Sequence, residues 1–147
     1  MKIVLAGDHS GFALKKIIVE FLKKYDHQVI DVGPAEKVSD DDYPDYVKKA
    51  IPKILENSDN RGIFLCRNGV GVCIAGNKYK GIRAALSWNP KHAVSSRNDD
   101  DTNVLCLPVD YIDERKALEI VSAWLLSSFS NEPRHHRRVQ KVGDILK

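Results

Sequence analysis

Short runs of apolar, often β-branched residues alternate with longer amphipathic stretches along the whole chain. This alternation is typical of α/β proteins, in which parallel strands are joined by crossover helices that cover both faces of the sheet. It predicts a three-layer α/β/α sandwich around a five-stranded parallel sheet of Rossmann-like type. The expected strands cover residues 2–6, 28–32, 62–66, 83–87 and 104–108.

The segments between these strands have apolar residues at helical spacing. In the first of them, between the first two strands, the lysines, including Lys15, are expected on the polar face opposite a wide apolar stripe. The last helical segment opens with Pro133, a residue favoured in the first turn of a helix. After the first, the expected helices cover residues 44–57, 70–77, 90–98, 113–127 and 133–146.

Length and charge narrow the range of functions. A chain of 147 residues without a linker is expected to form a single domain over residues 1–147. The net charge of +3 and the lack of a basic stripe interleaved with aromatics make nucleic acid an unexpected partner. No run approaches the ~20 apolar residues that span a bilayer, so no membrane association is expected. An odd number of cysteines, three, without a secretory signal predicts a cytoplasmic protein.

Ligands of open parallel sheets bind at the carboxyl ends of the strands. This rule selects four loops, at residues 7–11, 33–46, 67–71, and from Trp88 onwards to a continuation near Asn98. Functional side chains are therefore expected there.

Cys66 is the most informative candidate, because it stands where an apolar strand ends and a glycine-containing turn leads into a helix. A helix N-terminus carries unpaired N–H groups and partial positive charge, which favour a thiolate or another anion. Cys73 and Cys106 lie within apolar stretches and are expected to be buried and inert. Neither a dinucleotide fingerprint nor a phosphate loop of the Gly-Lys-Ser/Thr type is present, so nucleotide binding is not favoured.

Charged residues elsewhere allow two interpretations each. Asp8 and His9 follow the first strand and could contact sugar hydroxyls and an anion, or form a helix N-cap and a solvated turn. Arg134 and Arg138 share one helix face and could clamp a phosphate, or form a solvated charge cluster. The acidic run 99–101 is more typical of a loop or cap, and no metal site is assigned to it.

Several motifs occur together in a familiar order. They are GDHSGF, DYPDY, the turn at Cys66, IAGNKYKGIRAAL, DTNVL and RHHRRV. In this order and spacing the chain resembles the ribose-5-phosphate isomerase B family, which also contains galactose- and allose-6-phosphate isomerases. The likeness extends from residue 1 to about residue 146.

The resemblance implies an enzyme that interconverts ribose 5-phosphate and ribulose 5-phosphate through a cis-enediolate, without a metal or organic cofactor. It implies a homodimer or homotetramer with sites built across the subunit interface and the C-terminal helix packed across a dimer. Cys66 matches the catalytic thiolate, whereas members that use a Glu instead carry it where this chain has Val72. Asn68 and Asp99 occupy the other catalytic positions.

The resemblance also implies a set of substrate-binding residues. Asp8 and Tyr43 match residues that contact the sugar, and His9, Arg134 and Arg138 match a phosphate clamp, with the two arginines serving a neighbouring subunit. The backbone of the turn would hold the developing oxyanion. The remaining expected contacts are Arg67, Gly69, Val70, Gly71 and Asp100.

Four positions depart from the family pattern. Asn68 replaces a hydroxyl residue, Asp99 replaces the ring-opening His, Asp100 replaces an Asn, and Asp110 replaces a phosphate-binding Arg. Asp99 could take over the general acid-base catalysis of ring opening if its carboxyl group were buried. Otherwise His9 or His92 would open the ring, or the substrate would be open-chain.

Two rival functions remain open from the sequence. One is isomerisation of a six-carbon sugar phosphate, since the depth of the pocket decides whether one more carbon is accommodated. The other is a non-catalytic sugar-phosphate-binding protein whose substitutions have removed activity. A flavodoxin-like nucleotide-binding protein is a third alternative, which the missing phosphate-loop signatures disfavour.

Overall fold

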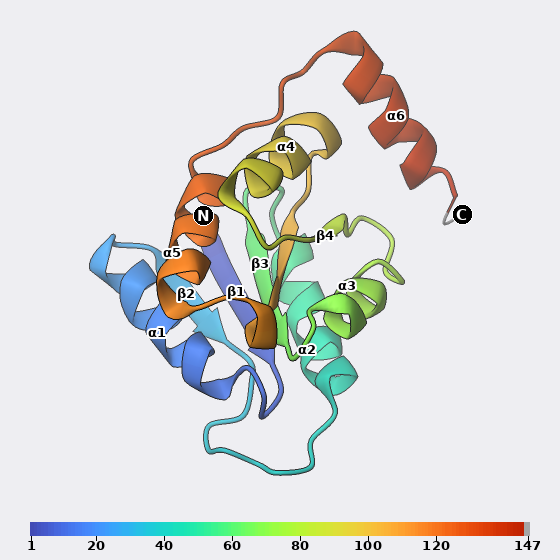
Figure 1. Cartoon of the computed structure of the whole chain (residues 1–147). Coiled ribbons are helices and arrows are strands. Elements are labelled where there is room, and N and C mark those ends of the chain that lie inside the picture. The colour runs from blue at the N-terminus through green and yellow to red at the C-terminus, as the bar shows by residue number, and fades with distance from the viewer. Residues whose placement is uncertain (146–147) are drawn as a thin grey trace.

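A single parallel sheet forms the centre of the computed structural model, which describes residues 1–145 (Figure 1). Its order is β2-β1-β3-β5-β4, and every pairing is parallel. The predicted five-stranded parallel sheet is therefore confirmed. The strands are β1 (Lys2–Gly7), β2 (Gln28–Asp31), β3 (Arg61–Cys66), β4 (Ala84–Leu86) and β5 (Val104–Pro108).

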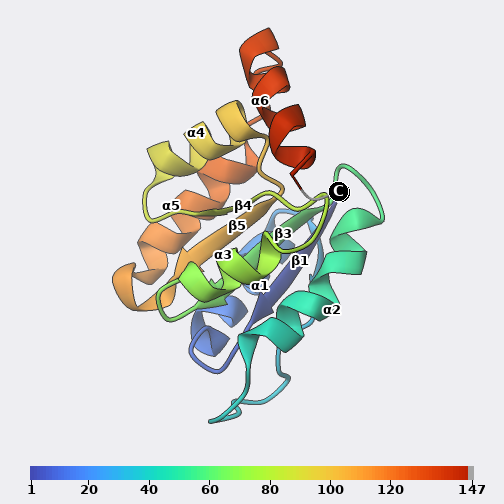
Figure 2. The same cartoon turned by 90° about the vertical axis from the view of Figure 1, so that its right-hand side faces the viewer.

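Helices cover both faces of this sheet, as Figures 1 and 2 show. Helices α1 and α5 pack on one face, and α2 and α3 on the other, which confirms the three-layer sandwich. The expected last helix ends at Gly143, so its predicted extension over residues 144 and 145, which form a turn, was wrong. Residue 146 of the predicted helix lies outside the described residues. The helices are α1 (Phe12–Lys24), α2 (Tyr43–Leu55), α3 (Val70–Gly76), α4 (Pro90–Asp100), α5 (Glu114–Leu125) and α6 (Pro133–Gly143), with a 3₁₀ turn η1 (Val109–Tyr111) after β5.

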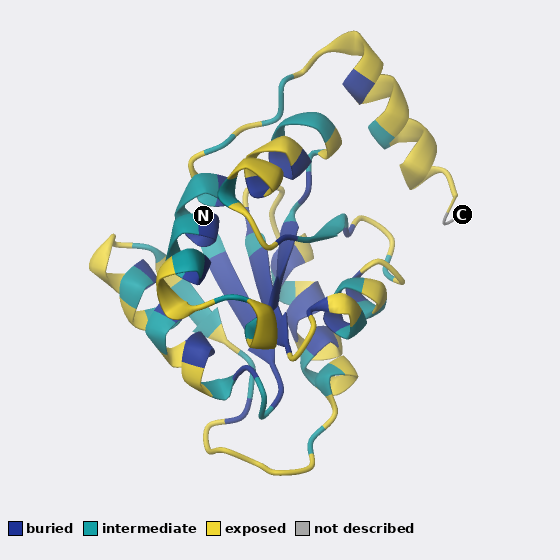
Figure 3. Cartoon of the chain, in the orientation of Figure 1, coloured by how far each residue is buried: buried dark blue, intermediate teal, exposed yellow. Residues whose placement is uncertain are grey.

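The sheet separates two apolar cores. Its central strands are buried along most of their length (Figure 3). Successive side chains of a strand point to opposite faces, so Ile63 and Leu65 of β3 join the core under α1 and α5. Phe64 and Cys66 join the core under α2 and α3. Because the central strands are buried on both faces, their sequences read as unbroken apolar runs.

Lys15 departs from the expectation of a polar helix face. Its side chain is 1% exposed, and its Nζ lies 2.9 Å from Asp31 Oδ1 and 3.2 Å from the carbonyl oxygen of Pro34. Gly33 leaves room for the ammonium group, because a Cβ there would lie 2.4 Å from Nζ. The prediction for Lys15 was wrong because a carboxylate from the neighbouring strand makes burial of the cation tolerable.

The two edges of the sheet are chemically distinct. The carboxyl edge holds the ends of β1 and β3, between which the strand order reverses, since β1 pairs with β2 on one side and with β3 on the other. The opposite, amino edge holds the starts of β3, β5 and β4, together with the end of α4.

Helix α6 extends away from the sandwich (Figures 1 and 2). It packs against α4, and its Val142, like Ile145 just beyond it, is exposed. Over residues 1–145, none of the helices has the length and apolar character needed to cross a bilayer.

Candidate active site

The turn after β3 is built as the sequence predicted. The strand ends at Cys66, and α3 begins four residues later at Val70. Gly69 between them has a φ of 70°, which residues with a side chain adopt at a cost. A Cβ at Gly69 would also lie 2.5 Å from Leu86 Cδ1. A glycine at this position therefore lets the chain turn tightly enough to place the thiol directly before a helix N-terminus.

The thiol of Cys66 lies at the border of the core. Cys66 is 4% exposed, and its Sγ lies 3.8 Å from Asn68 Oδ1. The backbone N–H of Val70 donates to the same oxygen over 3.0 Å. This bond fixes the orientation of the amide, so its oxygen rather than its N–H group faces the sulfur. As placed, Asn68 can accept a hydrogen bond from the thiol but does not donate one to a thiolate.

Of the backbone N–H groups of Asn68, Gly69, Val70 and Gly71, two are hydrogen-bonded within the turn and two are not. Gly69 N–H donates to the carbonyl oxygen of Cys66 over 3.3 Å, and Val70 N–H is taken by Asn68. Within residues 1–145, the N–H groups of Asn68 and Gly71 have no hydrogen-bond acceptor. These two donors are free to stabilise negative charge next to the thiol.

Tyr43 reaches the same turn from the first position of α2. A Cβ built on Gly71 would lie 2.6 Å from Tyr43 Oη and 2.5 Å from its Cζ, so the phenol ring occupies the space that a side chain at residue 71 would need. The structure thus brings Tyr43, Gly71 and the Cys66 turn together, as the sequence led us to expect.

Asp8 and His9 lie at the end of β1, on the same edge. Asp8 is buried, and its Oδ1 accepts a hydrogen bond from Ser10 N–H over 3.0 Å. The alternative role of Asp8 as an N-cap is not observed, because α1 begins after Gly11 without a side-chain cap.

His9 is held by Asp41, a residue that the sequence analysis did not single out. The backbone N–H of His9 donates to Asp41 Oδ1 over 2.9 Å, and His9 Nδ1 lies 2.7 Å from the same oxygen. Tyr46 Oη donates to Asp41 Oδ2 over 2.9 Å. Burial alone would raise the pKa of Asp41, but the hydrogen bonds from His9 and Tyr46 hold it below its usual value. His9 is therefore an oriented imidazole rather than a free turn residue.

Arg67 forms an ion pair with Asp110, one of the four positions that depart from the family pattern. Its Nε lies 2.9 Å from Asp110 Oδ2, and the backbone N–H of Asp110 donates to the carbonyl oxygen of Arg67 over 2.9 Å. Both side chains are exposed. The carboxylate offsets the positive charge of Arg67 beside the turn.

Asp99, Asp100, Arg134 and Arg138 lie at the amino edge, because α4 runs back from the end of β4 to the start of β5. The expectation that the loop continues at the carboxyl edge near Asn98 was therefore wrong. Within one chain, these four residues are not brought together with Cys66, whereas His9 and His92 remain at the carboxyl edge.

The surroundings of the amino-edge group are mostly open. Asp99 is 46% exposed, so the burial required for its acid-base role is absent in a single chain. Its Oδ1 lies 3.9 Å from Nδ1 of His135, a buried residue that the sequence analysis did not single out. Arg134 pairs with Glu132 over 2.8 Å. Arg138 and Asp100 line a cavity of about 440 Å³ whose apolar wall includes Ile82 and Val142.

The other two cysteines differ from each other. Cys106 is fully buried, as expected, and burial raises the pKa of its thiol. Cys73 is only partly buried, so the prediction of a buried, inert thiol was wrong for it. A hydrogen bond donated by the Cys106 thiol outweighs burial and lowers the pKa of Cys73 to about 7.

Metal-ligating side chains do not gather anywhere in the part of the chain that the structure describes. No group of three or more His, Cys, Asp or Glu side chains there is arranged to hold a metal ion.

The chain is similar to known proteins over nearly its whole length. A family model described as ribose/galactose isomerase matches residues 3–142. A Mycoplasma genitalium protein named "Probable ribose-5-phosphate isomerase B" is 43% identical over 95% of this chain and 92% of its own length.

Two solved structures superpose over nearly the whole chain. The M. genitalium ribose-5-phosphate isomerase B with bound ribulose 5-phosphate has a TM-score of 0.94 and 41% identity, over 98% of this chain and 95% of that one. The Clostridium thermocellum ribose-5-phosphate isomerase B has a TM-score of 0.93 and 41% identity, over 99% and 97%.

Proposed function

The chain belongs to the ribose/galactose isomerase family, and from this premise we propose that it interconverts ribose 5-phosphate and ribulose 5-phosphate. The bound ribulose 5-phosphate of the M. genitalium structure supports this choice of substrate. The observation that carries the proposal is the thiol of Cys66 next to two free backbone N–H groups at the carboxyl edge.

Cys66 is the base that moves the proton between the two carbons. Its thiolate removes the proton from C2 of the open-chain aldose, and the electron pair of the C–H bond forms the double bond of the enediolate. The negative charge develops on the oxygen of C1, where the N–H groups of Asn68 and Gly71 can donate to it. Each such preorganised donor typically contributes about 3 kcal/mol to the transition state. The hydroxyl proton of C2 then passes to the oxygen of C1, which leaves the negative charge on the oxygen of C2. The thiol then returns the proton to C1, which yields the ketose.

The residues around this turn bind the rest of the substrate. Asp8 and Tyr43 contact the sugar hydroxyls, and His9, held by Asp41, contacts the phosphate. The turn residues Arg67, Gly69 and Val70 border the reacting carbons. The pairing of Arg67 with Asp110 weakens its attraction for a phosphate.

The complete site needs a second subunit. Asp99, Asp100, Arg134 and Arg138 lie at the opposite edge of the sheet from Cys66, so a neighbouring chain contributes them in a homodimer or homotetramer. Helix α6 extends from the sandwich with exposed apolar side chains, which suits packing across a dimer. The three cysteines, all free, suit the reducing cytoplasm.

Replacing Cys66 with Ala tests the assignment of the base. We expect kcat to fall by about 10²–10⁴-fold, the usual contribution of a general base, in a direct assay of ribulose 5-phosphate formation. Cys73→Ala is the matched control, because it removes another thiol near the same turn and should retain activity. Near-normal turnover of Cys66→Ala would falsify the mechanism. Ligand-dependent stabilisation of the wild-type protein without any turnover would favour a binding protein instead.

Asp99 is the residue that opens the sugar ring, once the partner subunit covers it. Asp99→Asn should therefore slow the ring-closed substrate more than an open-chain substrate. Stopped-flow measurement of both substrates checks this. If the two are slowed equally, Asp99 has no role in ring opening. The same assay with six-carbon sugar phosphates tests the rival substrate by comparing kcat/KM.

A further inference from the structure

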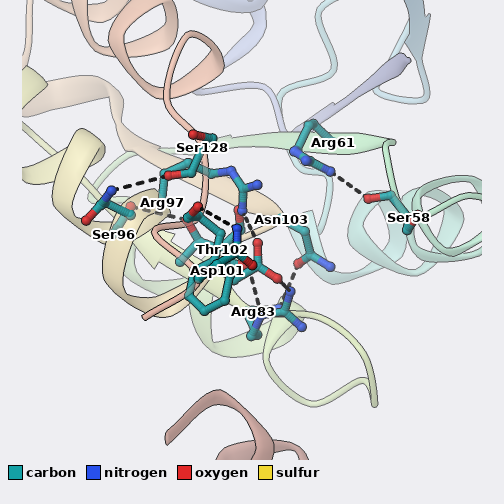
Figure 4. Close-up of polar contacts among 12 residues, drawn as sticks. Ser58, Arg61, Arg83, Ser96, Arg97, Asp101, Thr102, Asn103 and Ser128 are labelled. Atoms are coloured by element: carbon teal, nitrogen blue, oxygen red, sulfur yellow. Dashed lines mark hydrogen bonds and ion pairs between the residues drawn. The ribbon is translucent and has the colours of Figure 1, made fainter. Parts of the chain in front are cut away.

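A cluster of three arginines around one carboxylate occupies the amino edge of the sheet, where β3, β5 and β4 begin side by side (Figure 4). Arg83 Nη2 lies 2.6 Å from Asp101 Oδ2, and Arg97 Nη1 pairs with Asp101 Oδ1. Arg97 is buried and also donates to the carbonyl oxygen of Thr102 over 3.0 Å. Both oxygens of Asp101 are thus already paired with guanidinium groups.

Arg61, the first residue of β3, is the third guanidinium and the one without a carboxylate. Its Nη1 donates to the carbonyl oxygens of Ser58 and Asn60, each over 2.8 Å. Over residues 1–145, no Asp or Glu side chain forms an ion pair with Arg61, and its Nε and Nη2 have no hydrogen-bond acceptor.

The electrostatic environment of Arg61 is unfavourable for a cation. Arg61 is partly buried, and burial and then the positive charge of Arg97 lower its pKa. Asp101 and Asp59 oppose this shift, and Arg83 adds a smaller lowering influence. Holding like charges together in a desolvated place costs free energy unless an anion joins them. Asp101 pairs with Arg83 and Arg97, so among the described residues the third guanidinium, Arg61, has no carboxylate in contact with it.

The space beside Arg61 has the size and lining for such an anion. A cavity of about 290 Å³ is lined by the side chains of Arg61 and Arg83 and by the polar residues Asn57, Ser58 and Asn103, with Asp101 at its wall. This volume is several times the ~30 Å³ that one water molecule occupies in the liquid. Guanidinium groups bind the oxygens of phosphates through paired, charge-assisted hydrogen bonds.

We propose that this cavity binds a small polyvalent oxyanion, a phosphate group either free or carried by a metabolite, between Arg61 and Arg83. The site is distinct from the proposed active site of the same chain, which lies at the opposite edge of the sheet. The bound anion joins the starts of β3 and β4 and, through Asp101, the end of α4 that carries Asp99 and Asp100. Its occupancy therefore stabilises the segment that a partner's active site would use.

Titration with inorganic phosphate at constant ionic strength tests this site. The background is Arg134→Gln/Arg138→Gln, which removes the clamp proposed for the substrate phosphate, and thermal unfolding reports binding. We expect Tm to rise with phosphate, and Arg61→Gln in that background to weaken the phosphate dependence by about tenfold or more. Arg115→Gln is the control, because Arg115 is exposed and already paired with Glu119. Each variant is compared with its own phosphate-free Tm.

Two further measurements complete the test. In the wild-type protein, the Arg61 Nε–H signal in NMR spectra should shift on phosphate titration while that of Arg115 does not, a result independent of how Arg61→Gln folds. Comparing inorganic phosphate with ribose 5-phosphate shows whether the free ion or a phosphorylated metabolite binds more tightly. Equal phosphate dependence in Arg61→Gln, an unmoved Arg61 signal, or binding only at phosphate concentrations above about 0.1 M would each overturn the proposal.

Discussion

At the scale of single residues, the side chains around the proposed base are positioned by partners distant in the sequence. The oxygen of Asn68 faces the Cys66 thiol because Val70 N–H fixes the amide. Asp41 orients His9 across 32 positions of sequence. The protonation of the Cys73 thiol likewise depends on Cys106, which belongs to another element.

The pKa of Cys73, about 7, leads to a prediction on thiol reactivity. Alkylation of Cys73 by iodoacetamide should rise with pH around a midpoint near that value. Cys106→Ala removes the hydrogen-bond donor and should move the midpoint towards the ~8.5 of an ordinary thiol. Cys106→Ser keeps an O–H donor and should hold the midpoint low. Mass spectrometry of the alkylated peptides measures the rates, and an unchanged midpoint in Cys106→Ala would contradict the assignment.

The same shift has a consequence for stability. Because the pKa of Cys73 is lowered in the folded state, its thiolate stabilises the fold at pH values above the pKa of the unfolded thiol. This contribution declines as the pH falls through about 7. Its size is limited, because Cys73 is partly exposed.

At the scale of elements, the β3–turn–α3 unit places the chemistry. The strand supplies Cys66, the turn supplies two free N–H groups, and Gly71 in the first turn of α3 makes room for Tyr43. A helix this short is held by packing rather than by its own propensity, so the unit depends on the core under α2 and α3.

Gly71→Ala tests how closely this unit is packed. An Ala would normally favour a helix over Gly by about 0.5–1 kcal/mol, but here its Cβ would collide with the Tyr43 ring. We expect kcat/KM to fall at least about tenfold, as misplacement of a substrate-binding group usually does. Gly143→Ala in α6 is the control, because no neighbouring atom of residues 1–145 lies within 4 Å of the Cβ it would add. If Gly71→Ala and Gly143→Ala have the same steady-state kinetics, the Tyr43 ring moves aside without a loss of activity.

At the scale of the whole molecule, the proposed site is divided between the two edges of the sheet. Cys66 and His9 lie at the carboxyl edge, whereas Asp99 and Arg138 lie at the amino edge, close to the extended helix α6. A single chain cannot join these groups, because the full length of the strands lies between them. The proposed site therefore requires a second copy of the chain.

Mixing two inactive variants tests this division. Cys66→Ala and Arg138→Ala each lack one half of the site, yet a mixed dimer of the two contains one site with both halves intact. Random exchange of subunits at equal amounts should restore about a quarter of wild-type activity. The control is a mixture of Cys66→Ala with the double variant Cys66→Ala/Arg138→Ala, which should stay inactive. If the first mixture also stays inactive after confirmed subunit exchange, each site belongs to one chain.

The sequence by itself determined the local features of this protein. The periods of apolar residues predicted all five strands and six helices, and the glycines after Cys66 predicted the turn that the structure contains. These features depend on interactions among residues a few positions apart. The tertiary structure alone decided which distant residues meet: Lys15 with Asp31, His9 with Asp41, Cys73 with Cys106, and Arg61 with Arg83. It also decided that Asp99 lies far from Cys66. Strand order and the direction of each helix create such contacts, and no local pattern in the chain encodes them.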